Sequence, residues 1–346
     1  MKRSVLTGVL AAAAAAAVIC VIFIGAARQA PVAKESFAIP YNNRVLHDGL
    51  EILLVQSDGQ AFATLARDPS LSRPAEFGSD AEAAYRWQRP LLSYAAWAGS
   101  FGRSGWVPPA LAVLFVAATG VSAAGLGLLL ERRGIRPWAA IGLVLLPGTY
   151  ASLEYFGPEL LGLALVVWGL LKWTDPQRPR GVTALLFFTL AGLARETFLL
   201  VPAALALSAL WNRRFRDAAM LAASSVGWIA WIAIVRLRAG AWPTDAGQGR
   251  LTRPFAGLAT ALRETTQESV LPYLLLGAIV VAAVVLLCRS DVLCSVVLVH
   301  AAFASLMGER VWFDWQFFTR VLLPMYALGF VAILGRVLGE DRRLAG

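Results

Sequence analysis

The sequence predicts an all-α, polytopic membrane protein, and three observations support this fold class. The chain has 346 residues, of which 58% are hydrophobic and only 15% are charged, whereas a soluble domain carries charge on about a quarter of its residues. Long apolar runs recur from one end of the chain to the other, which is typical of membrane-spanning helices. The basic residues behind the net charge of +9 lie between these runs, so they indicate membrane topology and not a nucleic-acid partner.

The first element is an anchor helix over residues 1–26. Lys2 and Arg3 precede an apolar run that is long enough to span a bilayer. Arg28 stands where signal-peptide cleavage requires a small residue. We therefore expect an uncleaved anchor with its basic end in the cytoplasm.

Residues 27–105 form a long polar segment, which we place outside the cytoplasm as the first extracytoplasmic loop. A short helix is expected to follow Asp58 and to stop at Asp68-Pro69, and a second is expected to start near Ser79-Asp80. The apolar run of residues 90–101 is too short to span a bilayer. We expect these loop helices to lie in the membrane interface.

Residues 106–337 hold the remaining apolar runs, which bring the expected number of spans to about ten. The runs are 106–130, 138–153, 157–173, 181–194, 197–211, 217–235, 271–288, 292–307 and 320–337. Several are shorter than a straight span of roughly 20 residues, and prolines in or beside them predict bent or broken helices. The Arg-rich connections satisfy the positive-inside rule if both termini, including the tail 338–346, are cytoplasmic. An apolar 3.6-residue pattern around residues 255–262 predicts one more interfacial helix.

With this topology, ionisable residues from distant parts of the chain gather at the outer face. They are Asp58, Arg86, Arg89, Glu154, Glu159, Arg195, Glu196, Glu309, Asp314 and Arg320. Ionisable groups near hydrocarbon are costly, so they are candidates for function. Guanidinium groups suit a departing phosphate, and a carboxylate suits the removal of a proton from an attacking hydroxyl.

The order of these parts resembles the GT-C superfamily of integral-membrane glycosyltransferases. The segments similar to those of small bacterial members are Asp58-Gly59-Gln60-Ala61-Phe62, Ala66-Arg67-Asp68-Pro69, Tyr85-Arg86-Trp87-Gln88-Arg89-Pro90-Leu91-Leu92, Leu193-Ala194-Arg195-Glu196-Thr197 and Arg320-Val321-Leu322-Leu323-Pro324. The resemblance implies one GT-C-like domain over residues 1–346 in a bacterial-type inner membrane. It also implies transfer of a sugar, with inversion, from a polyprenyl-phosphate donor to a hydroxyl of a glycan, lipid or protein at the extracytoplasmic face.

The resemblance also implies roles for individual residues. Asp58 would be the catalytic base, and Arg195 and Arg320 would hold the phosphate. Gln60, Arg89 and Glu196 complete the expected substrate contacts, with Arg86 and Glu159 as further candidates. Many members pair two acids in the first loop, whereas Gly59-Gln60 follows Asp58 here, so a second loop acid and a divalent metal stay open.

Each candidate also has a plain structural reading. Asp58 stands at a helix start, where Asp caps backbone N–H groups, and Arg86 is spaced four residues from Glu82 for an ordinary helical ion pair. Adjacent Arg195 and Glu196 point to different faces, so each needs its own partner elsewhere. The Arg320 side chain could instead extend to the membrane interface. Glu159 could instead cap the helix that follows Pro158.

Two alternatives to a glycosyltransferase remain open. Broken helices beside charged residues also suit a transporter or flippase of a lipid-linked glycan. The missing second acid also suits a non-catalytic partner that retains the fold and stabilises another membrane enzyme.

Overall fold

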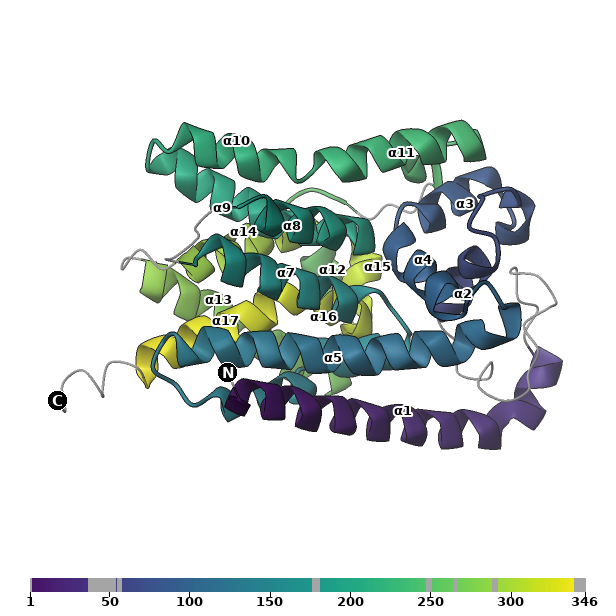
Figure 1. The fold of residues 1–346 in the computed structure, drawn as a ribbon, viewed down its shortest axis with the longest axis horizontal. Helices are drawn as coiled ribbons and strands as arrows, with labels where there is room; N and C mark the ends of the chain where they lie inside the picture. Colours follow the sequence, from purple (N-terminus) through teal and green to yellow (C-terminus); the bar gives the residue numbers. More distant parts are fainter. Residues whose placement is uncertain are drawn as a thin grey trace.

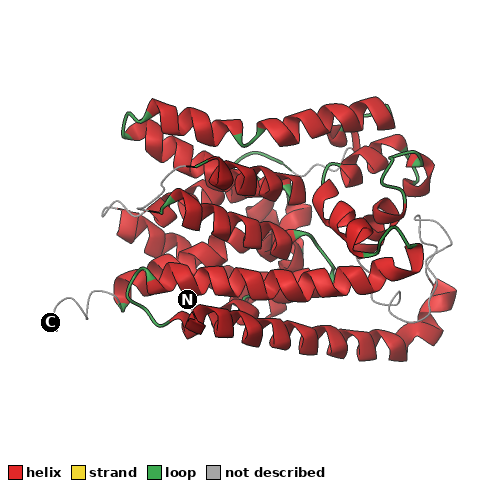
Figure 2. Ribbon diagram, in the orientation of Figure 1, coloured by secondary structure: helices red, strands yellow, loops and turns green. Residues whose placement is uncertain are grey.

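The computed structural model describes residues 2–36, 54, 58–175, 181–246, 251–263, 267–287 and 292–338. Within these ranges every secondary-structure element is helical, apart from an isolated bridge between Leu251 and Met307 (Figure 2). The predicted all-α class is therefore confirmed.

A long first helix and a group of short helices make up the N-terminal third of the chain. Their bounds are α1 (Lys2–Ser36), α2 (Gly59–Arg67), η2 (Pro74–Phe77), α3 (Asp80–Trp87), α4 (Pro90–Gly99) and η3 (Ser104–Trp106). The helix boundaries predicted here are confirmed, because α2 ends just before Asp68 and the Ser79 hydroxyl accepts a hydrogen bond from the Glu82 backbone N–H at the start of α3. Proline opens α4 at a position where no backbone donor is lost.

The rest of the chain forms a bundle around α5. Its helices are α5 (Val107–Glu131), η4 (Pro137–Leu145), α6 (Pro147–Glu154), α7 (Glu159–Trp173), α8 (Val182–Ala194), η5 (Glu196–Leu199), α9 (Leu200–Trp211), α10 (Phe215–Ala223), α11 (Val226–Ala239), η6 (Pro243–Ala246), α12 (Ala256–Arg263), α13 (Gln267–Leu287), α14 (Val292–Ser305), α15 (Glu309–Phe313), α16 (Trp315–Val321) and α17 (Leu323–Val337). Helix α5 runs along the length of the molecule and packs against α1, α4, α7 and α17 (Figure 1).

The expectation of about ten spans is met only in part. Three helical segments of the described chain are long and apolar enough to cross a membrane, namely Lys2–Gly25, Ser104–Glu131 and Phe215–Ala239. A fourth arises if α16 and α17, which meet at a 65° bend, count as one span. The other apolar helices are shorter, because a turn at Arg195 separates α8 from α9 and because 138–153 is split into the 3₁₀ helix η4 and α6.

Close helix contacts in the bundle depend on small residues. Gly8 of α1 lies against Gly120 of α5, so that a Cβ built on Gly8 would stand 2.7 Å from the Gly120 carbonyl oxygen. The absence of a side chain lets the two backbones touch, which is a common way to pack helices where the hydrophobic effect gives little drive.

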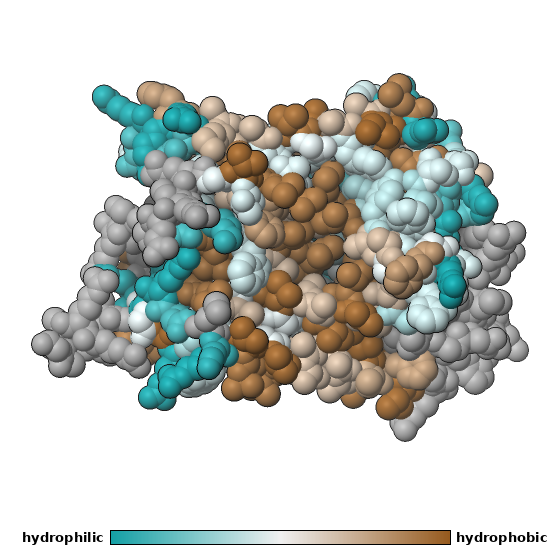
Figure 3. Space-filling model, viewed as in Figure 1, coloured by the Kyte–Doolittle hydropathy of each residue, from teal (hydrophilic) through white to brown (hydrophobic). Residues whose placement is uncertain are grey.

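The outer surface of the bundle is largely apolar. Figure 3 shows hydrophobic side chains over the middle of the molecule and hydrophilic ones towards its two ends. Large exposed hydrophobic residues lie on several helices, among them Val5, Val113, Leu186, Leu207, Ile229, Leu237, Leu274 and Val285. Such a surface suits lipid and not water, which is consistent with a membrane protein.

The two ends of the bundle differ. Figure 1 places α2, α3 and α4 at one end, which we call the loop end. The start of α1, the C-terminal ends of α5, α7 and α17, and the connection between α9 and α10 lie at the other. Basic residues follow these helix ends, including Arg132, Arg136, Arg213 and Arg214, and we call this the basic end.

Candidate functional site

Asp58 lies between two arginines that come from distant parts of the chain. Its Oδ1 accepts a hydrogen bond from Arg86 Nη1 at 2.9 Å, and its Oδ2 accepts one from Arg320 Nη1 at 3.0 Å. Asp58 immediately precedes α2, Arg86 is on α3 and Arg320 is on α16. We call these three residues the Asp58 site.

The Asp58 carboxylate does not cap α2. Asp58 occupies the N-cap position, but its side chain makes no capping hydrogen bond, so the capping alternative is wrong for this side chain. Burial alone would raise the pKa of the Asp58 carboxyl, but the charges of Arg320 and Arg86 outweigh burial and hold this pKa well below its usual range. The side chain keeps 31% of its surface exposed, so the carboxylate is ionised and accessible.

Arg320 is held in place from several sides. Its guanidinium carbon lies 4.5 Å from the ring centre of Tyr155 and 5.4 Å from that of Phe317, distances at which a cation is attracted to an aromatic face. Its Nε also donates to the Gln316 carbonyl oxygen at 3.3 Å. Only 3% of Arg320 is exposed, so the alternative in which it extends to the interface is wrong.

Arg86 has a second partner beside Asp58. Its Nε donates to Glu82 Oε1 at 2.9 Å, which confirms the helical pair predicted from the spacing. This contact does not exhaust the side chain, because a different nitrogen of the same guanidinium reaches Asp58. Arg86 therefore belongs both to α3 and to the Asp58 site.

Two further ion pairs lie next to the Asp58 site. Arg89 forms a two-bond contact with Glu196, with Nε–Oε2 at 2.7 Å and Nη2–Oε1 at 2.5 Å, and Arg195 pairs with Glu159. The prediction that adjacent Arg195 and Glu196 need separate partners is therefore confirmed. Burial alone would lower the pKa of Arg89, but Glu196 raises it above its usual value.

These pairs are close enough to Asp58 for their charges to act on it. The charge of Arg89 contributes to the lowered pKa of Asp58, and the charges of Arg195 and Asp58 also interact. Glu159 is fully buried at the first position of α7 and Arg195 is 8% exposed. The expected residues are thus brought together, with Asp58 and Arg86 nearer the surface and Arg195 and Glu159 deeper.

The position of Gln60 tells less about its role. It lies in the first turn of α2 and is 4% exposed. Its place two residues after Asp58 brings it to the same region, and its expected substrate contact stays a prediction.

Sequence reasoning missed the residues that orient Arg320. Tyr155 and Phe317 supply the aromatic faces, and the backbone N–H of Gly59 donates to the Tyr155 carbonyl oxygen at 3.2 Å, which ties the start of α2 to the end of α6. Gln316 donates through Nε2 to Glu154 Oε2 at 2.6 Å. An aromatic residue beside a membrane helix is so common as an interface anchor that its type gave no signal of this role.

The Asp58 site holds one carboxylate and two guanidinium groups. Across the part of the chain that the structure describes, no three or more His, Cys, Asp or Glu side chains group as metal ligands. In the Asp58 site the carboxylate oxygens are engaged by guanidinium groups instead.

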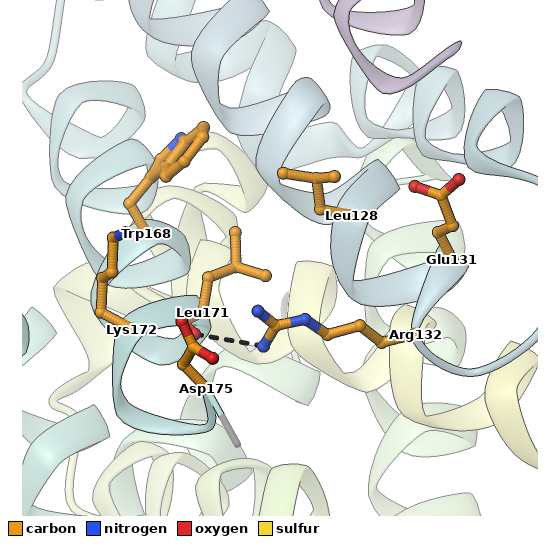
Figure 4. Close-up of a pocket in the computed structure, with 7 residues that line it drawn as sticks. All are labelled: Leu128, Glu131, Arg132, Trp168, Leu171, Lys172 and Asp175. Atoms are coloured by element: carbon orange, nitrogen blue, oxygen red, sulfur yellow. Dashed lines mark hydrogen bonds between the residues drawn. The ribbon is translucent and has the colours of Figure 1, made fainter. Parts of the chain in front are cut away.

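A cavity of about 430 Å³ lies at the basic end of the bundle, away from the Asp58 site (Figure 4). Its lining is Leu128, Glu131, Arg132, Trp168, Leu171, Lys172 and Asp175. The Arg132 guanidinium crosses the space between α5 and α7 and donates to the Leu171 carbonyl oxygen at 3.1 Å. Acids and bases balance in this lining, and none of its residues was a site candidate.

The arrangement at the Asp58 site combines an accessible carboxylate with guanidinium groups at one end of an apolar bundle. A carboxylate accepts protons and guanidinium groups bind anions such as phosphate, so the site brings together the groups that acid–base chemistry beside a phosphate requires. Comparisons of the chain with known protein families, with characterised proteins and with solved structures find no match.

Proposed function

We propose that the chain is a membrane glycosyltransferase that uses a polyprenyl-phosphate sugar as donor and a hydroxyl of a glycan, lipid or protein as acceptor. The observation that carries the proposal is the Asp58 site. Residues separated by 262 positions in the chain deliver an acid and a buried arginine to direct contact, at the loop end of a bundle with an apolar exterior. Buried charges are costly in such a setting, so their retention favours function.

In the proposed reaction Asp58 takes the proton of the acceptor hydroxyl as its oxygen attacks the anomeric carbon of the donor. The bond between that carbon and the phosphate oxygen breaks, and the prenyl phosphate leaves with the electron pair. Arg320 neutralises the charge that develops on the leaving phosphate. Arg195 is a second candidate for this role, because its buried Nε lacks a hydrogen-bond partner among the described residues.

The proposed orientation follows from the charges. The basic end of the bundle would face the cytoplasm and the loop end would face outwards, as the positive-inside rule requires. A lipid-linked donor in the outer leaflet would then reach the Asp58 site laterally through the apolar surface.

The proposal is tested with the purified full-length chain in lipid vesicles. A panel of radiolabelled polyprenyl-phosphate sugars serves as donors, and transfer to glycan, lipid and protein acceptors is measured. Asp58→Asn is expected to lower transfer by at least about a hundredfold, which is typical of a lost general base. Asp80→Asn, the same change at an exposed acid of the same segment, is the matched control and is expected to retain transfer.

Undiminished transfer by Asp58→Asn would remove Asp58 from the mechanism.

The transporter alternative is favoured by the broken helices η4–α6 and α16–α17. It predicts that the chain moves a fluorescent lipid-linked glycan between leaflets without changing it. Activity of the chain alone decides against a non-catalytic partner.

A further inference from the structure

The contacts of Asp58 conflict with its proposed role as a catalytic base. Both carboxylate oxygens are engaged by guanidinium groups, one from Arg86 and one from Arg320. A carboxylate held in this way is a weak proton acceptor, because proton binding would remove the charge that attracts both arginines. Asp58 must lose at least one of these contacts before it acts on a hydroxyl.

Both arginines have supports that do not depend on Asp58. Arg86 is anchored by Glu82 at 2.9 Å. Arg320 is anchored by the Gln316 carbonyl oxygen and by the rings of Tyr155 and Phe317. If the Asp58 carboxylate moves away, each guanidinium is therefore still directed into the site.

The Asp58 carboxylate also resembles a phosphate group in the features that arginine recognises. A phosphodiester, like a carboxylate, presents two oxygens that share one negative charge, and arginine binds either group with parallel hydrogen bonds. The carboxylate and Arg86 are exposed by 31% and 19%, so a ligand approaching from outside meets these groups before it meets the buried Arg320.

We infer that Arg86 and Arg320 form the binding site for the phosphate of a lipid-linked donor, and that the Asp58 carboxylate occupies this site when the donor is absent. This inference rests on the proposed function and assigns a ligand contact to Arg86. Binding of the donor phosphate displaces Asp58 from the two arginines, and the released carboxylate becomes available to the acceptor hydroxyl. The base is thus free only when the donor is in place.

The inference predicts that removing the proposed base strengthens phosphate binding. The probe is farnesyl phosphate, a phosphomonoester that keeps the lipid and the phosphate of the proposed donor but lacks its sugar. Its binding to the detergent-solubilised full-length chain is measured by calorimetry, for the wild type and for four variants. Asp58→Asn is expected to bind about three- to tenfold more tightly, because a competing charge-assisted contact is lost. Arg86→Gln and Arg320→Gln are each expected to bind at least about tenfold more weakly.

Asp80→Asn is the matched control, because it removes one acidic charge from the same segment without touching either arginine, and it is expected to bind as the wild type does. Binding of farnesol alone and of inorganic phosphate alone shows how much the lipid part and the phosphate part of farnesyl phosphate each contribute. Both should bind more weakly than farnesyl phosphate, and equal binding of inorganic phosphate would overturn the lipid part of the inference. The thermal unfolding midpoint and the elution volume of each variant show whether it is folded.

Equal or weaker binding of farnesyl phosphate by folded Asp58→Asn would overturn the inference. This outcome is separate from a failure of the proposed function. If Asp58→Asn abolishes sugar transfer but does not strengthen binding, the function stands and the competition is wrong. If binding is strengthened but no donor supports transfer, the phosphate site stands and the glycosyltransferase is wrong.

Discussion

At the scale of single residues, the candidate site depends on charges that are paired across long stretches of chain. Asp58, Arg89 and Arg195 each pair with a residue from another segment. Sequence reasoning identified which residues needed distant partners, because adjacent charges on one helix point in different directions. It did not identify the partners themselves, since pairing is set by how the helices pack.

The lowered pKa of Asp58 makes a prediction about pH. A carboxyl whose pKa is lower in the folded protein than its usual value of about 3.9 stabilises the fold above that value, and the contribution is lost as pH falls through the folded pKa. The difference in thermal unfolding midpoint between wild type and Asp58→Asn is therefore expected to stay constant from pH 8 to about pH 5 and to shrink only below that. A difference that already shrinks between pH 7 and pH 5 would show that the arginines do not hold the carboxylate.

The Arg89–Glu196 pair is expected to couple strongly. A double-mutant cycle with Arg89→Gln and Glu196→Gln should give a coupling free energy of about 1.5–3 kcal/mol, because both hydrogen bonds join charged groups and the Arg89 side chain is largely buried. The measurement is chemical unfolding in detergent. The control is the pair of Arg73 and Glu76, which is 3.4 Å apart with Arg73 57% exposed, and its coupling should stay below about 1 kcal/mol. Equal coupling in the two cycles would contradict a structural role for the buried pair.

At the scale of helices, the sequence predicted several boundaries correctly, but α1 continues to Ser36 beyond the expected end at residue 26, and the expected run 217–235 is divided between α10 and α11. The starts of α3 and α4, the end of α2 and the break at Arg195 follow from capping residues, prolines and charge, which act locally. The 3₁₀ helix η4 and the 65° bend between α16 and α17 were not specified in detail. Pro147 indicated a break within residues 138–153, whereas residues 320–337 were expected to form one span and their bend was not predicted, because the size of a bend depends on neighbouring helices.

The contact between α1 and α5 provides a prediction at this scale. Gly8→Ala is expected to destabilise the protein by about 1–3 kcal/mol, because the added methyl group meets the Gly120 carbonyl oxygen and Ala124 of the facing helix. Gly25→Ala on the same helix is the matched control, since nothing lies within 4 Å of a Cβ at that position. Unfolding midpoints in detergent compare the two variants, and equal midpoints would mean that α1 does not pack closely on α5.

At the scale of the whole molecule, the sequence predicted the all-helical class, whereas of about ten predicted spans only three or four are helices of the described chain that are long and apolar enough to cross a membrane. Composition and apolar runs were enough for an all-helical membrane protein, because they do not depend on packing. Several runs counted as spans are short helices or pieces of broken ones. Whether such a piece crosses a membrane depends on its neighbours, which single-sequence patterns do not contain.

The proposed topology is tested by cysteine labelling in intact cells. In a background without the native cysteines, Asp80→Cys is expected to react with a membrane-impermeant maleimide added outside. Arg136→Cys is expected to react only after permeabilisation, because it lies at the basic end, which the positive-inside rule places in the cytoplasm. Both positions are exposed, so lack of reaction reflects the side of the membrane. The reverse pattern would invert the proposed orientation.

The contact between Asp58 and Arg320 has a consequence for biosynthesis. Asp58 is synthesised first, and Arg320, which lies on α16, is synthesised 262 residues later. A product that terminates before α16 contains Asp58 and Arg86 but lacks Arg320, so it cannot form the contact between Asp58 and Arg320. Under the proposed function, a chain that lacks Arg320 is therefore expected to be inactive.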